Sequence, residues 1–91
     1  MSVKSEFVRI VGDAIACLRE LDSAPAGSLA ADLERARDAA SHDLSGAAAR
    51  VLELWETAAP TAALAGGADA CDRLDAAAAR ARAVSKVILG R

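Results

Sequence analysis

Aromatic side chains are almost absent from this sequence, since one phenylalanine, one tryptophan and no tyrosine make up 2% of its 91 residues. A core packed around large rings and a surface that stacks on nucleic-acid bases are therefore excluded. Strand patterns are also missing, because apolar and polar residues do not alternate over any sustained stretch and β-branched residues do not cluster. The fold class that remains is all-α.

Cysteine is scarce, since Cys17 and Cys71 are the two in the chain and they lie far apart. A secreted, disulfide-stapled domain of this size would usually carry about four cysteines or more. Long hydrophobic runs are missing too, and charged residues interrupt the segment 1–20, which excludes a signal peptide and a membrane span. We expect a cytoplasmic protein with free thiols and no membrane partner.

A strong charge of one sign is lacking as well, since 11 basic residues stand against 13 acidic ones and the formal net charge is −2. No run of like charge is long enough to attract phosphate backbones or anionic lipids. A helix-turn-helix drawn through 35–54 would present mainly small side chains to the bases, and Arg50 alone would not hold DNA. Nucleic acid is therefore not an expected partner.

Alanine is the residue that the sequence has in abundance, with 25 copies among the apolar residues that form 54% of the chain. Alanine has the highest helix propensity but contributes little burial energy, so we expect closely spaced helices around a narrow core. The length indicates a single helical-bundle domain over 1–91 that buries roughly 60–65% of its unfolded surface. Its stability margin is expected to be small, and a second subunit would add to it.

Apolar residues recur at steps of three and four along most of the chain, which predicts three helices. Their approximate bounds are 3–22, 29–59 and 69–89. Ser2, Ser28 and Asp69 precede these helices as N-caps, and Gly90 follows the last one. A loop over 61–68 precedes the third helix. We expect an up-down-up three-helix bundle with a long middle helix.

The middle helix is predicted to be continuous, although Ser45 and Gly46 lie near its centre. Its apolar residues keep one phase on both sides of this pair, and a helix that stopped and restarted there would have no reason to keep it. Such a helix, ended by Pro60, would be roughly 45 Å long and would extend past its neighbours. The alternative is that Ser45 caps a new helix, which gives four shorter helices.

Residues 41–43 read Ser-His-Asp, the side chains of a hydrolase triad, but they are consecutive. Successive helical residues point about 100° apart, so these three side chains cannot form the hydrogen bonds of a triad. We therefore predict no catalytic residues and a protein that is not an enzyme. A metal site formed by Cys17, His42 and Cys71 would need His42 to turn toward the core, so no metal or cofactor is expected.

Two predicted helices carry more apolar surface than a lone three-helix chain needs. Val8, Val11 and Ile15 widen the face of the first helix, while Leu52 and Trp55 form a row beside the core stripe of the second. One interpretation is that the third helix covers this row. The other is that all five residues form a contact surface for another chain, with Trp55 as its anchor.

The leading functional hypothesis is a small non-enzymatic protein–protein interaction module, either a homo-oligomer or a subunit that binds another protein. The alternative is a small-molecule sensor or carrier with a pocket between the helices near Cys17 and Trp55. Fluorescence of Trp55 distinguishes the two, because a contact surface predicts a shift with protein concentration and a pocket predicts a shift with ligand.

Overall fold

The computed structural model of the chain describes residues 2–21, 23–57 and 68–90. The helices in these ranges are α1 (Val3–Glu20), α2 (Ala24–Ala39), α3 (Leu44–Thr57) and α5 (Ala68–Leu89). No strand occurs in the described ranges, so the predicted all-α class is confirmed. None of the helices in these ranges has the length and apolar content that crossing a membrane requires.

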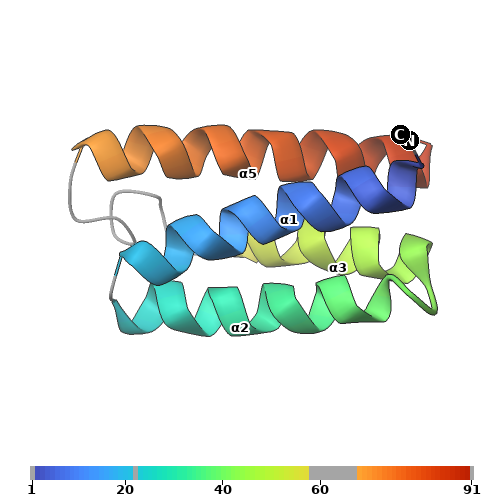
Figure 1. Cartoon of the computed structure of the whole chain (residues 1–91), viewed down its shortest axis with the longest axis horizontal. Helices are drawn as coiled ribbons and strands as arrows, with labels where there is room; N and C mark the ends of the chain where they lie inside the picture. Colours follow the sequence, from blue (N-terminus) through green and yellow to red (C-terminus); the bar gives the residue numbers. More distant parts are fainter. Residues whose placement is uncertain (1, 22, 58–67, 91) are drawn as a thin grey trace.

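The four described helices form a ring in which each helix packs against two neighbours (Figure 1). The neighbouring pairs are α1–α2, α2–α3, α3–α5 and α1–α5. α1 and α3 run in one direction and α2 and α5 in the other, so every neighbouring pair is antiparallel. The prediction of three helices is therefore wrong, and the fold is an up-down-up-down bundle of four.

The helix predicted over 29–59 is in fact two helices. α2 ends at Ala39, the chain turns through residues 40–43, and α3 begins at Leu44 and runs back along α2 (Figure 1). The longest extent of the molecule is 34 Å, which is shorter than the roughly 45 Å expected for one continuous helix. The overhang that was expected to leave apolar surface uncovered does not exist.

Asp43 ends the turn and caps α3. Its Oδ1 accepts a hydrogen bond from the backbone N–H of Gly46 at 3.0 Å, and its carbonyl oxygen accepts one from the N–H of Ala47 at 3.0 Å. The carboxylate thus satisfies an N–H group that has no partner within the helix. Gly46 suits this position because a Cβ there would meet the Asp43 carboxylate. The predicted alternative of a fourth helix is correct in number, but the cap is Asp43 instead of Ser45.

The spacing of apolar residues predicts one continuous helix because the turn between α2 and α3 does not interrupt that spacing. Ala40 lies four residues before Leu44, and four residues is also a step along one face of a helix. Ala40 is buried and Leu44 is half-buried against the core, so both face inward although no helix joins them. For a turn of this length, spacing cannot distinguish two antiparallel helices from one long helix.

Serine residues cap the first two helices. The Ser2 hydroxyl accepts a hydrogen bond from the N–H three residues later at 3.2 Å, which confirms Ser2 as the N-cap of α1. Ser23, and not the predicted Ser28, caps α2 with the same geometry at 3.3 Å. Pro25 therefore lies in the first turn of α2, where its missing N–H removes no helical hydrogen bond.

The helix predicted over 69–89 is confirmed, because α5 spans Ala68–Leu89. Gly90 follows it with φ of 74°, in the left-handed region that glycine adopts without strain at a helix C-terminus. The predicted end at Pro60 and the loop over 61–68 lie outside the described residues, apart from Ala68. The side chain of Asp69, the predicted cap, also lies outside them.

The core is narrow and rich in alanine, as the composition predicts. Four large side chains, from three helices, are completely or almost completely buried: Phe7, Leu18, Leu33 and Leu74. Alanines occupy many of the positions between them and are buried on all four helices or at their ends. Small side chains allow neighbouring helix axes to approach closely, so contact between helices replaces the large apolar side chains that the sequence lacks.

Candidate functional site

The five residues predicted as a contact surface lie mostly in the interior of the single chain. Val11, Ile15 and Leu52 are buried, and Trp55 is half-buried against the core. Val8 is at the surface with 36% of its area exposed. The structure does not bring the five residues together on one exposed face. A bundle of four helices covers the apolar surface that a bundle of three would leave exposed.

Trp55 lies at the edge of the core with its indole N–H enclosed. Its Nε1 atom is buried and has no hydrogen-bond acceptor among the described residues. A buried N–H without an acceptor lowers stability, so Trp55 serves α3 chiefly through the packing of its ring. Cys17 is half-buried on α1, and its thiol is free.

The Ser41-His42-Asp43 turn does not assemble a catalytic group. The Ser41 hydroxyl donates to the carbonyl oxygen of Asp38 at 2.9 Å, and the Asp43 carboxylate is engaged as the cap of α3. His42 is exposed, and no hydrogen bond joins the three side chains in the described structure. Among the described side chains, no group of three His, Cys, Asp or Glu residues is arranged to hold a metal ion.

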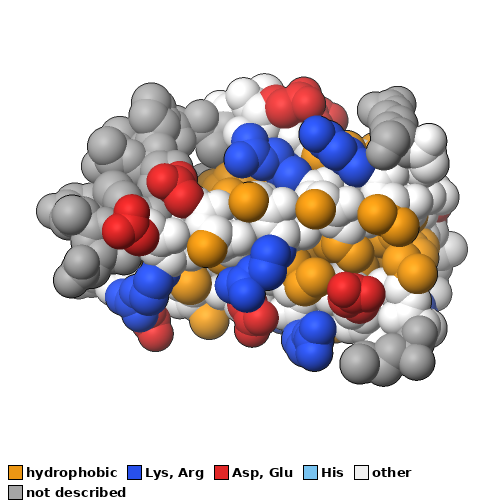
Figure 2. Space-filling model, turned by 90° about the horizontal axis from the view of Figure 1, so that it is seen from above, with side chains coloured by type: hydrophobic (Ala, Val, Ile, Leu, Met, Phe, Trp, Pro, Cys, Tyr) orange, Lys and Arg blue, Asp and Glu red, His pale blue; other side chains and the backbone are white. Residues whose placement is uncertain are grey.

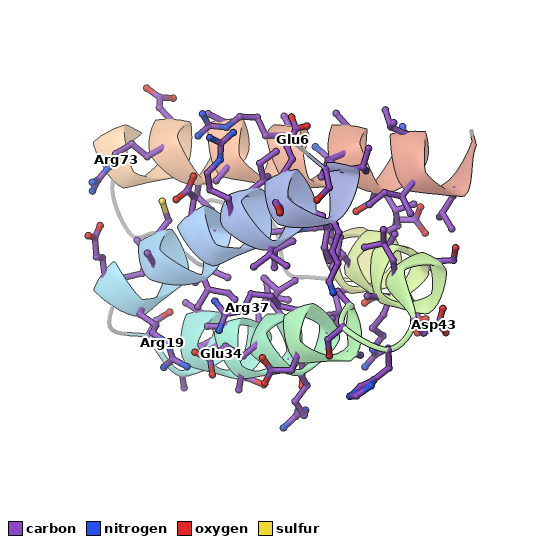
Figure 3. All side chains as sticks on the ribbon, turned by 45° about the vertical axis from the view of Figure 1, so that its right-hand side comes forward. Glu6, Arg19, Glu34, Arg37, Asp43 and Arg73 are labelled. Atoms are coloured by element: carbon purple, nitrogen blue, oxygen red, sulfur yellow. The ribbon has the colours of Figure 1, made fainter. Side chains whose placement is uncertain are left out.

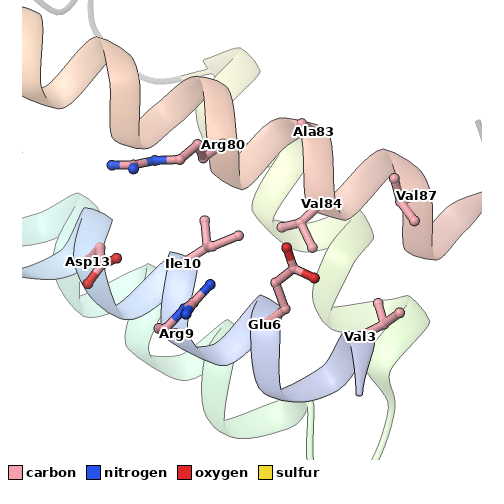
Figure 4. A pocket seen from close by; sticks show the side chains of 9 residues that line it. All are labelled: Val3, Glu6, Arg9, Ile10, Asp13, Arg80, Ala83, Val84 and Val87. Carbon is pink, nitrogen blue, oxygen red and sulfur yellow. The ribbon is translucent and has the colours of Figure 1, made fainter. Parts of the chain in front are cut away.

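A groove between α1 and α5 combines exposed apolar side chains with charges. We call it the α1–α5 groove; its volume is about 510 Å³ and residues of these two helices line it. On α1 the lining residues include positions 3, 6, 10 and 13, and on α5 they include positions 80, 84 and 87 (Figure 4). These are steps of three and four, so a single face of each helix forms each wall.

The floor of the groove and one of its ends are apolar. Ile10 is half-buried and Val84 is buried where α1 meets α5. Val3 and Val87 lie together at one end, and they are 43% and 67% exposed. With Val8, these two valines are the large hydrophobic side chains that the described part of the chain exposes. Figure 2 shows hydrophobic atoms gathered on this side of the molecule, with basic and acidic side chains around them.

Four exposed charged side chains surround the α1–α5 groove, two of them acidic and two basic. They are Glu6, Arg9, Asp13 and Arg80 (Figure 4). None of the four belongs to an ion pair between described residues. Farther along the same helices, Arg73, labelled in Figure 3, forms an ion pair with Glu20 at 3.3 Å. An ion pair thus joins α1 and α5 at one end of their junction, while the four charged side chains around the groove have no ion-pair partner among the described residues.

Two other grooves offer less to a partner. One, of about 210 Å³, lies between α2 and α3, and the other, of about 330 Å³, lies where α1 meets α2. An arginine in each is already paired within the chain, Arg50 with Glu53 in the first and Arg19 with Glu34 in the second (Figure 3). Neither groove contains an exposed large hydrophobic residue. Cys17 and Trp55 line none of the three grooves.

The sequence does not reveal this groove because the buried face of α1 is rotated from its predicted centre. The spacing that predicts the first helix puts Val3, Phe7 and Ile10 on one face. The buried line instead runs through Phe7, Val11 and Leu18. Val3 and Ile10 consequently border α5 at the surface. The steps of four from Phe7 to Val11 and on to Ile15 are the signal that could have shown the rotation.

No protein-family model, curated protein or solved structure matches this chain. An apolar centre with a charged border is the arrangement found at protein–protein contacts, and it provides no nucleophile paired with a base.

Proposed function

We propose that this chain is a small non-enzymatic protein-interaction module whose contact surface is the α1–α5 groove. The observation that carries the proposal is the exposure of Val3 and Val87 in a groove whose four charged side chains form no ion pair with another described residue. Exposed apolar side chains with a charged border are characteristic of contact surfaces. This surface replaces the one predicted from the sequence, since Val11, Ile15 and Leu52 are buried in the core.

The shape of the groove suits a helical partner. Two antiparallel helices form its walls, and helices of a partner can pack against both of them. A partner helix packed on these walls contributes apolar side chains at steps of three and four. Val84 and Val87 lie one such step apart on α5. Val3 and Ile10 lie seven residues apart on α1, which is two such steps.

Photo-crosslinking tests this proposal. Benzoylphenylalanine is placed at Val87 in the groove and, as the control, at Ala49, which is exposed on α3 and lies outside the groove. We expect position 87 to give a protein adduct, either in a pure solution of the chain or in cells that produce it. Mass spectrometry identifies the attached protein and the peptide that carries the link.

The variant with the probe at position 49 measures how much adduct forms through random collisions. If position 87 gives no more adduct than position 49 both in pure solution at about millimolar concentration and in the producing cells, the groove is not a contact surface. An adduct from both positions in equal amount would count against the proposal in the same way.

The volume of the groove supports a second candidate, the small-molecule sensor or carrier. Its 510 Å³ falls within the roughly 300–1,000 Å³ that is usual for small-molecule sites. The ligand would combine a short apolar body with a charged group, which Arg80 or Asp13 could bind. Such a ligand would raise the melting temperature of the wild-type chain and not that of Val84→Trp, in which the indole fills the groove.

A further inference from the structure

We infer that the α1–α5 groove is covered by the same groove of a second copy of this chain, in a dimer whose two-fold axis runs along the groove. This inference rests on the proposed function and names its partner. In this dimer α1 of each copy packs against α5 of the other, and the two helices are antiparallel, as every neighbouring pair is within one chain. Antiparallel pairing also sets the helix dipoles in their favourable arrangement.

The balance of charge in the groove points to a second copy. Two acidic and two basic side chains surround it, so it has no net charge with which to select an acidic or a basic partner. A surface that carries both signs is complementary to itself when a two-fold axis brings opposite charges together. Since these four residues form no ion pair with any residue in the ranges that the structure describes, their charges are available for this pairing.

The two ends of the groove fix the direction of the axis. Val3 and Val87 lie at one end, and Asp13 and Arg80 lie at the other (Figure 4). An axis parallel to the helices exchanges α1 with α5 but leaves each end in place. The four valines of the two copies then form one apolar cluster, and each Asp13 faces Arg80 of the other copy.

An axis across the groove gives a poorer match. It would turn the second copy end over end, so that Val3 and Val87 of one copy cover Asp13 and Arg80 of the other. Charged side chains would then lose water without gaining a partner, which is unfavourable. The arrangement with the axis along the groove avoids this, because apolar residues meet apolar residues and acids meet bases.

The contact is short, so the dimer should be weak. The groove extends along α1 from position 3 to position 13, which is about 15 Å of helix. Stable complexes usually bury about 800 Å² on each partner, and two short helix faces provide less. We therefore expect a weak, transient dimer whose population rises with protein concentration.

Charge reversal followed by mixing tests the dimer. Two variants of the full chain, Asp13→Arg and Arg80→Asp, are studied separately and as an equimolar mixture by sedimentation velocity. Each variant alone brings like charges together across the two-fold axis and should stay monomeric. In the mixture both intermolecular pairs are again opposite in charge, so a dimer should form with at least tenfold higher affinity than either variant shows alone. Circular dichroism and thermal melting establish that each variant is folded.

The mixture separates contacts between chains from contacts within one. Within each variant, positions 13 and 80 carry charges of the same sign, and mixing does not change this. A dimer that forms only in the mixture must therefore result from contacts between the two different chains. A wild-type chain that stays monomeric at about 1 mM, or a mixture of folded variants that stays monomeric, would overturn the inference. If either charge variant fails to fold, Val87→Lys, a change at an exposed position, is used in its place. We expect this variant to self-associate at least tenfold more weakly than the wild type. Self-association as strong as that of the wild type would overturn the inference.

The two proposals fail in different ways. A monomeric wild-type chain that still gives a position-87 adduct with another protein would refute the second copy as partner and leave the interaction module in place. If position 87 gives no specific adduct with any protein, both proposals are refuted.

Discussion

Asp43 is the single residue that most directly divides the middle of the sequence into two helices. Its carboxylate accepts the hydrogen bond from Gly46 that starts α3, and the two residues before it are exposed in the turn. Without this acceptor, the first turn of α3 would hold one more N–H group that only water can satisfy.

We expect Asp43→Ala to lower the free energy of unfolding by about 1 kcal/mol, the usual cost of removing an N-cap. In a domain of this size the melting temperature should fall by roughly 4–8 °C. Thermal unfolding followed by circular dichroism measures the change. Asp43→Ser is the control, because serine also caps helices and should recover most of the loss. Equal stability of the alanine variant and the wild type would show that the cap contributes nothing.

At the scale of the helices, the sequence predicts ends well where capping and periodicity agree. Ser2 and Gly90 define the outer ends of the bundle, and both were predicted from residue type and position. The break at 40–43 could not be predicted from the pattern, since the turn keeps the apolar phase intact. The groove could not be predicted either, because the neighbours of α1 decide which part of its apolar face is buried, and that is a tertiary property.

The two faces of α5 should respond differently to the loss of side-chain volume. Leu74 is completely buried, so Leu74→Ala should cost about 2–5 kcal/mol of unfolding free energy. Val87 is 67% exposed, so Val87→Ala should cost less than about 0.5 kcal/mol. Urea denaturation at a concentration at which the wild type is monomeric measures both. A loss of more than about 1 kcal/mol for Val87→Ala would mean that Val87 supports the fold and is not free for a partner.

At the scale of the whole molecule, one junction between the described helices combines exposed valines with charges that form no ion pair with another described residue. That junction is the α1–α5 groove, and Trp55 does not line it. The position of Trp55 gives a test that separates this dimer from one built on the surface predicted from the sequence.

The emission maximum of Trp55 should stay constant while the chain passes from monomer to dimer. Its indole is already half-buried, with Nε1 enclosed, and the proposed contact lies on other residues. Fluorescence is recorded over the concentration range in which sedimentation shows association, and the unfolded chain in urea provides the reference for an exposed indole. A shift that follows dimer formation would favour a contact through Leu52 and Trp55 and would contradict the groove.

The ring of helices has one junction that joins elements distant in sequence. The other three pairs are consecutive among the described helices, whereas α1 and α5 stand at opposite ends of the chain. Closing a longer loop costs more entropy, so this junction should be the last to form during folding. A second copy that packs on both α1 and α5 would hold this junction together. Dimer formation would therefore also lengthen the lifetime of the folded chain in the presence of proteases.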